Sequence, residues 1–254
     1  MIPTLRVNNL AKSFGGLRAV SGISLEVCPG EVLSVIGPNG AGKTTLFNCL
    51  SGVYQPNEGE IVLERRSIRG LAPHIICRRG LSRTFQNIRL FGEMTAKENI
   101  MACQVRLEKP LPWDVLFRTP QFFRREKASE DEALNLLRMV GLEKEEETWA
   151  RNLPYGFQRR LEIARALATK PRVLLLDEPG AGMNPNEVSE ISNLICQIKK
   201  MGLAILLIEH HMKVVMDLSD RIVVLDHGEK IAEGTPEEIR NHPAVIAAYL
   251  GKEN

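Results

Sequence analysis

The sequence has 254 residues, of which 44% are hydrophobic and 25% are charged, as in ordinary globular proteins. This length suffices for one large α/β domain, or for a core with an inserted subdomain. The formal net charge of +2 says little about partners. The longest apolar runs, such as Val173–Leu176 and Leu203–Ile208, are too short to cross a bilayer.

Five cysteines are spread along the chain without the spacing of a metal site: Cys28, Cys49, Cys77, Cys103 and Cys196. We expect them to be reduced, small residues in the core of a cytosolic chain. The chain passes from Met1-Ile2-Pro3-Thr4 directly into alternating residues, so we expect no signal peptide.

Alternating apolar residues indicate strands in the first part of the chain. Leu5 and Val7 alternate with polar neighbours as in an edge strand, and Ile23–Val27 shows the same pattern. Pro29-Gly30 then turns the chain into the next strand, so we expect an antiparallel layer here. After a loop, Glu60–Leu63 returns as a further strand.

The apolar run Val32–Ile36 predicts a buried strand, and the residues after it fit G-x-x-x-x-G-K-[ST], the phosphate-binding P-loop. They are Gly37, Pro38, Asn39, Gly40, Ala41, Gly42, Lys43 and Thr44, with Thr45 following. Glycines let successive backbone N–H groups curl around phosphate oxygens, and the next helix directs its positive end at the anion. Lys43 would reach the β- and γ-phosphates, and the Thr44 hydroxyl would bind Mg²⁺. We therefore predict that the chain binds a nucleoside triphosphate; the alternative is a glycine-rich turn that binds nothing.

Between Thr95 and Glu147 the spacing of apolar residues becomes helical, as in Ala96–Val105 and Ala128–Val140. Between these helices lies an aromatic, proline-containing stretch, part of an insertion over 108–127. It could form a surface that touches a partner or lipid headgroups. We favour a loop that packs its own aromatic residues against the helices.

A second group of polar residues lies behind a predicted helix. Arg160–Leu167 reads as that helix, which stops at Lys170-Pro171. Val173–Leu176 is then a buried strand that leads into Asp177 and Glu178, at the sheet edge where open α/β sheets bind ligands. Asp177 can hold Mg²⁺ there through water, and Glu178 can accept a proton from an attacking water.

The next buried strand, Ala204–Ile208, places His210 at the same edge, near the phosphates. A lone histidine is more often structural, but this position favours a functional role, whereas His211 reads as a solvated residue at a helix start. The remaining elements are short. They are a hairpin over Ile222–Leu225 and Lys230–Glu233 and helices over Pro236–Arg240 and Val245–Leu250.

These motifs occur in the order found in ATP-binding-cassette (ABC) ATPases, and the resemblance covers essentially the whole chain. It rests on the P-loop, Gln86, L-P-Y-G-F-Q before R-R-L-E-I-A-R-A-L, L-L-L-D-E-P and I-E-H. The extended L-P-Y-G segment, E-P-G-A-G-M-N-P and the ending A-Y-L-G resemble the LivG-type ATP-binding subunits of branched-chain amino acid importers. The resemblance implies an α/β P-loop NTPase core with an N-terminal antiparallel β layer and an inserted helical subdomain. We expect the core over 1–92 and 160–254, and the helical subdomain with its signature motif over 93–159.

The resemblance also implies roles for individual residues. Phe14 would stack on adenine, with a packed core phenylalanine as the alternative. Gln86 would sense Mg²⁺ and the attacking water, Glu178 would be the catalytic base, and His210 the switch histidine at the γ-phosphate. The segment Gly180–Asn184 would be the D-loop, which crosses the interface of a sandwich dimer.

ATP and Mg²⁺ are the implied substrate and cofactor, and the implied dimer partner is a second ABC ATPase, of a different or the same chain. Two integral-membrane permeases and an extracytoplasmic solute-binding protein complete such a transporter. The chain would therefore sit peripherally at the cytoplasmic side of the cell membrane. Ile88, Leu90 and Phe91, which follow Gln86, are candidates for contact with a permease, or are simply buried. No nucleic acid is expected as a partner.

The signature and D-loop depart from the usual residues of the family, where the signature reads L-S-G-G-Q. The replacements are Pro154, Tyr155 and Phe157 in the signature, and Asn184 for the D-loop aspartate. Losing the serine hydroxyl removes one contact to the partner's γ-phosphate. Backbone N–H groups at the helix start are still available. We expect Leu153, Gly156 and Gln158 to face the partner's nucleotide.

Two other functions fit the same motifs less well. An exporter ATPase, such as that for lipopolysaccharide, has a cassette of similar length, and only the subfamily motifs weigh against it. Non-transport ABC proteins of DNA repair or translation usually carry two cassettes, a coiled-coil insertion or a strongly basic surface, and this sequence has none of these. The choice of solute lies in other chains of a transporter.

Overall fold

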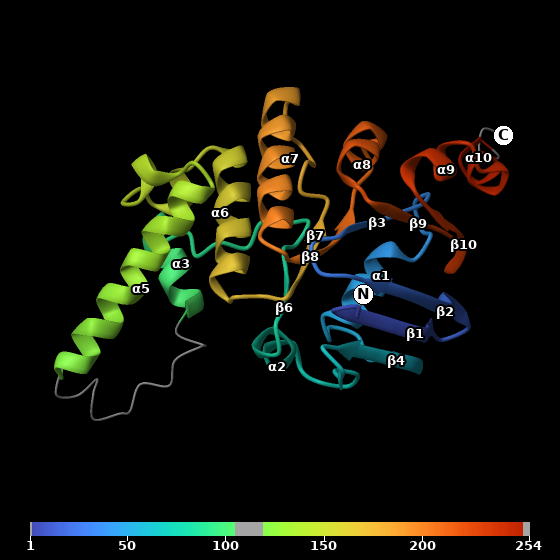
Figure 1. The fold of residues 1–254 in the computed structure, drawn as a ribbon, viewed down its shortest axis with the longest axis horizontal. Coiled ribbons are helices and arrows are strands. Elements are labelled where there is room, and N and C mark those ends of the chain that lie inside the picture. Colours follow the sequence, from blue (N-terminus) through green and yellow to red (C-terminus); the bar gives the residue numbers. More distant parts are fainter. Residues whose placement is uncertain (1, 105–118, 251–254) are drawn as a thin grey trace.

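The computed structural model describes residues 2–104 and 119–250. Its strands are β1 (Leu5–Phe14), β2 (Leu17–Val27), β3 (Val32–Ile36), β4 (Glu58–Leu63), β5 (Arg66–Ser67), β6 (Leu81–Arg83), β7 (Val173–Asp177), β8 (Ala204–Ile208), β9 (Arg221–Asp226) and β10 (Glu229–Gly234). Its helices are α1 (Lys43–Leu50), α2 (Pro73–Arg78), α3 (Ala96–Gln104), α5 (Pro120–Met139), α6 (Tyr155–Ala168), α7 (Pro185–Lys200), α8 (Met212–Leu218), α9 (Pro236–Arg240) and α10 (Pro243–Leu250), with short turns η1 (Glu143–Glu145) and η2 (Ala150–Asn152). The molecule is elongated, with α3 and α5 at one end and the C-terminal helices at the other (Figure 1).

The larger, 6-stranded sheet has the order β10-β9-β3-β8-β7-β6; neighbouring strands from β9 to β6 are parallel, and β10 is antiparallel. In β7, Val173 and Leu175 belong to the core shared with α1, whereas Leu174 and Leu176 belong to the core on the other face. Successive side chains of a strand point to opposite faces, and both faces of this sheet are covered. A continuous apolar run is the result, and the buried strands predicted from such runs are confirmed.

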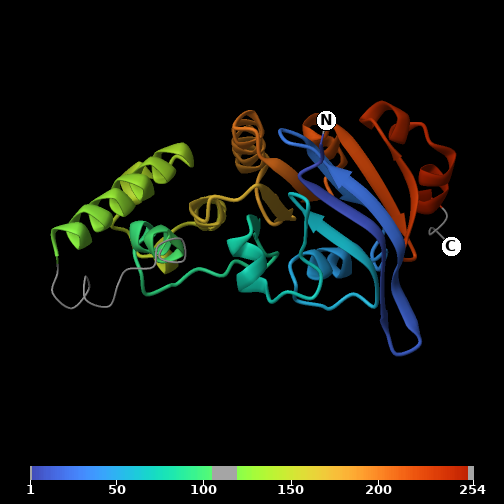
Figure 2. The ribbon, with the colours of Figure 1, turned by 60° about the horizontal axis from the view of Figure 1, so that its bottom comes forward.

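The predicted antiparallel layer is present as a 4-stranded sheet in the order β2-β1-β4-β5, and it packs with α1 against the larger sheet (Figure 2). Two details of its prediction are wrong. Leu5 of β1 lies opposite Val27 of β2 on one side and Leu63 of β4 on the other, so β1 is an inner strand. An alternating pattern shows that one face of a strand is buried. It does not show whether the strand has a neighbour on one side or on both sides. The turn at Pro29-Gly30 leads into β3, which belongs to the parallel sheet and not to this layer.

Of the helices in the middle region, α3 begins at Ala96 as predicted, whereas α5 and α6 begin earlier than the apolar spacing predicts. Thr119 caps α5 by accepting a hydrogen bond from the Phe122 N–H at 3.3 Å, and Pro120 occupies the first turn. Phe122 and Phe123 are therefore helical, and Phe123 is 53% exposed, so the prediction of a loop packing these aromatics was wrong. Residues 105–118, which include the rest of that aromatic stretch, lie outside the described residues. The helix predicted from Arg160 begins at Tyr155, and it runs across the expected boundary between the helical subdomain and the core.

The prediction of reduced cysteines in the core is only partly correct. All five are free, but Cys49 alone is buried, and the other four are half-buried. Burial raises the pKa of the Cys49 thiol to about 11. At pH 8 only about one Cys49 in a thousand is then a thiolate, which is the reactive form.

We therefore expect iodoacetamide at pH 8 to alkylate Cys49 about a hundredfold more slowly in the native protein than in urea, where the thiol regains an ordinary pKa. Peptide mass spectrometry over a time course measures this rate. Equal rates in the native and unfolded protein would contradict the assignment of Cys49 to the core.

Candidate nucleotide-binding and hydrolysis site

The carboxyl ends of three neighbouring parallel strands meet at one edge of the larger sheet. Ile208, the last residue of β8, is in register with Asp177 of β7 on one side and with Val35 of β3 on the other. The segments that follow these strands therefore leave the sheet beside one another. They are the P-loop after β3, Glu178 after β7, and His210 after β8, as the sequence predicts.

The P-loop presents the start of α1 to a ligand. No side chain of the described residues caps this helix, so the N–H groups of its first residues, Lys43, Thr44 and Thr45, are presented to an anion. Lys43 is buried, and its ammonium donates to the backbone oxygens of Gly37 at 2.7 Å and Pro38 at 3.0 Å. Thr44 is exposed. The loop therefore has the donors that a phosphate chain requires.

The tip of the loop is open and its base is tightly packed. Asn39 and Gly40 are exposed at the tip. Ala41 is buried and donates from its N–H to the Pro38 oxygen at 3.2 Å. Gly42 has φ of 100°, and an ideal Cβ there would lie 2.4 Å from the Ala19 oxygen of β2. Only glycine fits where β2 approaches the loop so closely.

Glu178 lies at the centre of the second part of the site. Its Oε2 accepts a hydrogen bond from Gln86 Nε2 at 3.1 Å, and its Oε1 lies 2.5 Å from His210 Nε2. An ionised carboxylate only accepts hydrogen bonds, so Nε2 of His210 carries the proton in this contact. Glu178 has φ of 50°, a left-handed conformation that costs energy for a residue with a side chain and recurs at active sites. The structure thus brings together the three residues predicted for hydrolysis.

Asp177 is held by an arginine that sequence analysis did not identify. Its Oδ2 accepts from Arg83 Nη2 at 2.8 Å, and both side chains are 5% exposed. The other guanidinium nitrogen, Nη1, donates to Asn48 at 2.7 Å and to Ser51 at 3.0 Å. This buried pair fixes the carboxylate between β6, β7 and α1. No signal in the sequence identifies this partner, because the pairing of β6 beside β7 is known only from the structure.

The signature segment forms the start of α6. The helix begins at Tyr155, and the side chain of its N-cap residue, Pro154, makes no capping hydrogen bond. Gln158 Nε2 donates to the oxygen of the buried Leu153 at 2.9 Å, so these two residues hold the turn before the helix within this chain. An ideal Cβ at Gly156 would lie 2.7 Å from Glu187 Oε1, which places the signature glycine against α7.

Tyr155, at the position of the family's first signature glycine, reaches the D-loop. Its hydroxyl donates to the Ala181 oxygen at 3.1 Å and accepts from Arg159 Nη2 at 3.2 Å. The same Arg159 nitrogen donates to the backbone oxygen of Gln86 at 2.7 Å, and Nη1 donates to Glu162 at 2.8 Å. Burial raises the pKa of the Glu162 carboxyl, against the lowering effects of a backbone N–H and the arginine. A wholly buried arginine, which sequence analysis missed, thus joins the signature helix to the Gln86 segment.

Asn184 has a structural role of its own, because it caps α7. Its side chain accepts from the N–H groups of Asn186 at 3.0 Å and Glu187 at 3.1 Å, and Glu187 accepts from the Asn184 N–H at 2.9 Å.

We expect Asn184→Ala to lower the free energy of unfolding by about 1 kcal/mol and Asn184→Asp to leave it unchanged, since aspartate caps equally well. Urea unfolding measures both. Equal stability of the alanine variant and the wild type would contradict the cap.

Phe14 lies at the end of β1 and is 43% exposed, so it is not a core phenylalanine. Its ring meets that of Tyr54 edge-on, with centroids 5.1 Å apart, and the Lys12 ammonium lies 5.0 Å from its centroid. The exposed ring is available for a ligand. A second aromatic residue is Tyr249 of α10. Partial burial raises the pKa of its phenol, against a lowering effect of the Gly37 backbone.

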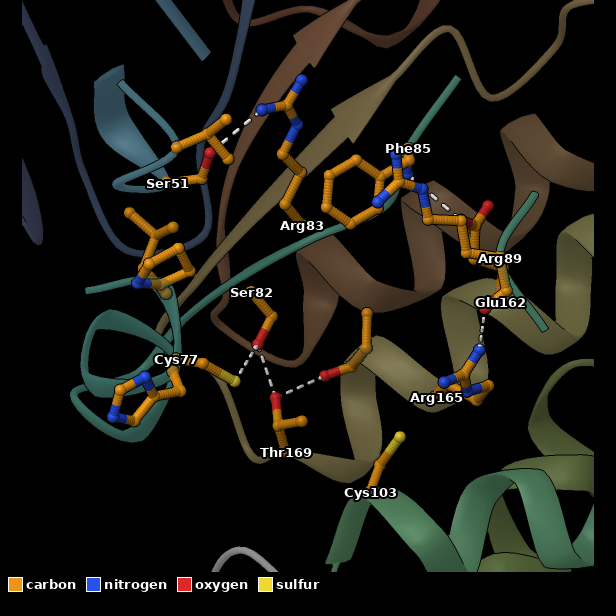
Figure 3. Close-up of a pocket in the computed structure, with 15 residues that line it drawn as sticks. Ser51, Cys77, Ser82, Arg83, Phe85, Arg89, Cys103, Glu162, Arg165 and Thr169 are labelled. Carbon is orange, nitrogen blue, oxygen red and sulfur yellow. Dashed lines mark hydrogen bonds between the residues drawn. The ribbon is translucent and has the colours of Figure 1, made fainter. Parts of the chain in front are cut away.

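A groove of about 490 Å³ lies between α2, β6, α3 and α6, and Arg83 and Ser51 are among the residues that line it (Figure 3). Arg89, from the segment after Gln86, lines this groove. Its guanidinium lies 4.7 Å from the centroid of the Phe85 ring. Its further lining residues include Val53, Pro73, His74, Cys77, Cys103, Glu162 and Arg165. The residues predicted for contact with a permease, Ile88, Leu90 and Phe91, are not among those that line it. Leu90 packs against the helical core, and Phe91 is 49% exposed.

The two sheets, the uncapped P-loop helix and the cluster of Gln86, Glu178 and His210 define an ABC ATPase. The family described as ABC transporter matches residues 20–181, and the family described as branched-chain amino acid ATP-binding cassette transporter matches residues 229–253. The chain belongs to the family of branched-chain amino acid transport ATP-binding proteins. It is 50% identical to the high-affinity branched-chain amino acid transport ATP-binding protein LivG of Salmonella typhimurium over 98% of both chains.

More distant proteins share the same fold. The lipopolysaccharide export system ATP-binding protein LptB of Haemophilus influenzae is 37% identical over 98% of both chains. A solved ATP-binding cassette of an ABC transporter in its ADP conformation has a TM-score of 0.85 at 32% identity, covering 99% of this chain and 100% of its own. The predicted fold class is confirmed, and the exporter alternative is less well supported than the LivG type.

Proposed function

We propose that this chain couples ATP binding and hydrolysis to the uptake of branched-chain amino acids, as the ATPase subunit of an importer. The observation that carries the proposal is the contact of Glu178 with both Gln86 and His210, beside an open P-loop helix. The membership of the LivG-type family supports the solute class, and the lower identity to LptB favours an importer over an exporter.

In the proposed mechanism, ATP binds with its phosphates on the P-loop. The N–H groups at the start of α1 and the Lys43 ammonium donate hydrogen bonds to the phosphate oxygens. To do so, Lys43 gives up its hydrogen bonds to the backbone oxygens of Gly37 and Pro38. Phe14 stacks on the adenine with its exposed ring. The signature segment of a second cassette closes over this nucleotide. In the same way, Leu153, Gly156 and Gln158 of this chain close over the partner's nucleotide, where the start of α6 faces the γ-phosphate.

The site has a donor set that fits Mg²⁺, which prefers oxygen ligands. The exposed Thr44 hydroxyl, the Asp177 carboxylate acting through water, and the amide oxygen of Gln86 supply such donors. The amide nitrogen of Gln86 is already used by Glu178. When bound, Mg²⁺ neutralises charge on the phosphate oxygens.

Glu178 then orients and deprotonates the attacking water. Each of its oxygens has a second lone pair beside the one used by Gln86 or His210, so it can accept a hydrogen bond from water. As the water oxygen bonds to the γ-phosphorus, the bond to the ADP oxygen breaks and a proton passes to Glu178. His210 stays within reach of both Glu178 and the γ-phosphate and holds the water in line.

The partners are proposed from the same surfaces. A second ABC ATPase, different from this chain, completes the sandwich dimer. The transporter has two integral-membrane permeases, and one of them docks at the groove of this chain that Phe85 and Arg89 line. A solute-binding protein delivers the amino acid to the permeases from outside the cell membrane. The chain itself binds peripherally on the cytoplasmic side. Among residues 2–104 and 119–250, every helix is too short or too polar to span a membrane.

Purification of the tagged chain from native membranes in mild detergent tests these partners. We expect two polytopic proteins and a second ATPase of similar size to co-purify, with a binding protein whose amino acid can then be identified. Recovery with lipopolysaccharide-export components would overturn the solute class while leaving the cassette intact. Recovery as a soluble protein bound to nucleic acid or ribosomes would overturn the transport function.

A further inference from the structure

Glu209, between β8 and His210, is a buried carboxylate that the mechanism above does not use. It is 3% exposed. Its Oε1 accepts a hydrogen bond from the Gly180 N–H at 2.8 Å, and its Oε2 accepts from the N–H groups of His210 at 2.9 Å and His211 at 3.3 Å. The His211 ring also approaches, with Nδ1 3.4 Å from Oε2. One side chain therefore binds the backbone of two separate loops.

These two loops carry the groups that meet in the hydrolysis site. Gly180 follows Glu178 by two residues and begins the D-loop, and His210 contacts Glu178 directly. A backbone hydrogen bond also joins the two loops, since the Glu178 N–H donates to the Ile208 oxygen at 2.9 Å. The fit is close, because an ideal Cβ at Gly180 would lie 2.8 Å from Glu209 Oε1.

We propose that Glu209 is a positioning residue, which ties the His210 loop to the D-loop and so sets the contact between His210 and Glu178. The consequence for hydrolysis rests on the proposed function. The chemistry of the side chain suits this task, because a carboxylate only accepts hydrogen bonds and three backbone N–H groups only donate them. Because Gly180 belongs to the D-loop at the proposed dimer interface, a movement of that loop carries His210 with it.

The alternative is that Glu209 only stabilises the fold, and a matched pair of variants separates the two roles. Glu209→Gln keeps the size of the side chain but directs an NH₂ donor at one of the backbone N–H groups, so one loop loses its acceptor. Glu31→Gln is the control. Glu31 also accepts a backbone N–H, that of Cys28 at 2.6 Å, and lies 3.2 Å from Arg221, but it precedes β3 at the opposite end of the strand from the P-loop.

The test combines steady-state ATP hydrolysis, urea unfolding and hydrogen exchange on the full chain. We expect Glu209→Gln to lower kcat by about 10- to 100-fold with KM for ATP within about twofold, because small misplacements of positioned groups are costly in rate. Amide exchange is expected to rise in residues 178–184 and 209–213 and to stay unchanged elsewhere. We expect Glu31→Gln to keep kcat within about twofold, whatever its stability.

Retention of kcat within about twofold in Glu209→Gln would show that Glu209 serves the fold alone, and so would a rise in exchange spread evenly over the chain. A wild-type chain that neither binds nor hydrolyses ATP would overturn the proposed function instead. The exchange experiment needs no nucleotide, and it still decides whether Glu209 ties the two loops together.

Discussion

Replacing Glu178 by glutamine is expected to slow ATP hydrolysis by about 10²- to 10⁴-fold and to leave ATP binding intact. Glutamine has nearly the same size, so the site keeps its shape, but an amide cannot take a proton from the attacking water. The hydrogen-bond donors to the phosphates belong to the P-loop, and the substitution does not alter them. ATP therefore stays bound between two cassettes, and the closed dimer accumulates.

Single-turnover hydrolysis and titration with a fluorescent ATP analogue separate the two steps. Size-exclusion chromatography with ATP and the second ATPase reports the dimer. Glu190→Gln is a suitable control. Its carboxylate is 56% exposed and lies 3.6 Å from Arg160, a surface pair of small energetic effect. We expect this variant to hydrolyse ATP normally. Near-normal turnover of Glu178→Gln would remove Glu178 from the role of base.

The sequence predicted the parts of the site that lie at the ends of apolar runs. Val173–Leu176 and Ala204–Ile208 are too apolar for any place except a covered sheet, and parallel strands end at a common edge. Asp177, Glu178 and His210 follow such runs, so their convergence could be predicted without the structure. The register of Ile208 with Asp177 confirms this convergence.

The buried polar residues could not be predicted in this way. Arg83, Arg159 and Glu209 each bind groups that lie far away in the sequence, and a single polar residue does not indicate its partner. Their burial is favourable only because the folded chain supplies matching donors or acceptors. Helix starts are a different case. Thr119 followed by Pro120 is a readable cap signal, which the apolar spacing of α5 obscured.

The other large effect is expected at Gly37, where the P-loop leaves β3. An ideal Cβ at this position would lie 2.1 Å from the backbone oxygen of Leu225 in β9, and φ is 151°. Gly37→Ala must therefore push apart two strands of the central sheet. Overpacking and backbone strain each cost about 1–3 kcal/mol, so we expect the free energy of unfolding to fall by about 2–6 kcal/mol and ATP binding to be lost.

Gly40→Ala is the matched control, in the same loop and also at positive φ, 81°. Apart from the glycine and its two chain neighbours, no atom of residues 2–104 and 119–250 lies within 4 Å of the added Cβ. Only the cost of the left-handed conformation applies there, about 1–2 kcal/mol. Urea unfolding of both variants, with ATP binding measured on each, compares a glycine required by close packing with one required by backbone conformation alone. Equal loss of stability would mean that β9 yields to the new methyl group. A clearly larger loss at Gly37 would show that the first glycine of the motif serves the sheet as well as the nucleotide, because the P-loop can begin there only if β3 and β9 remain paired.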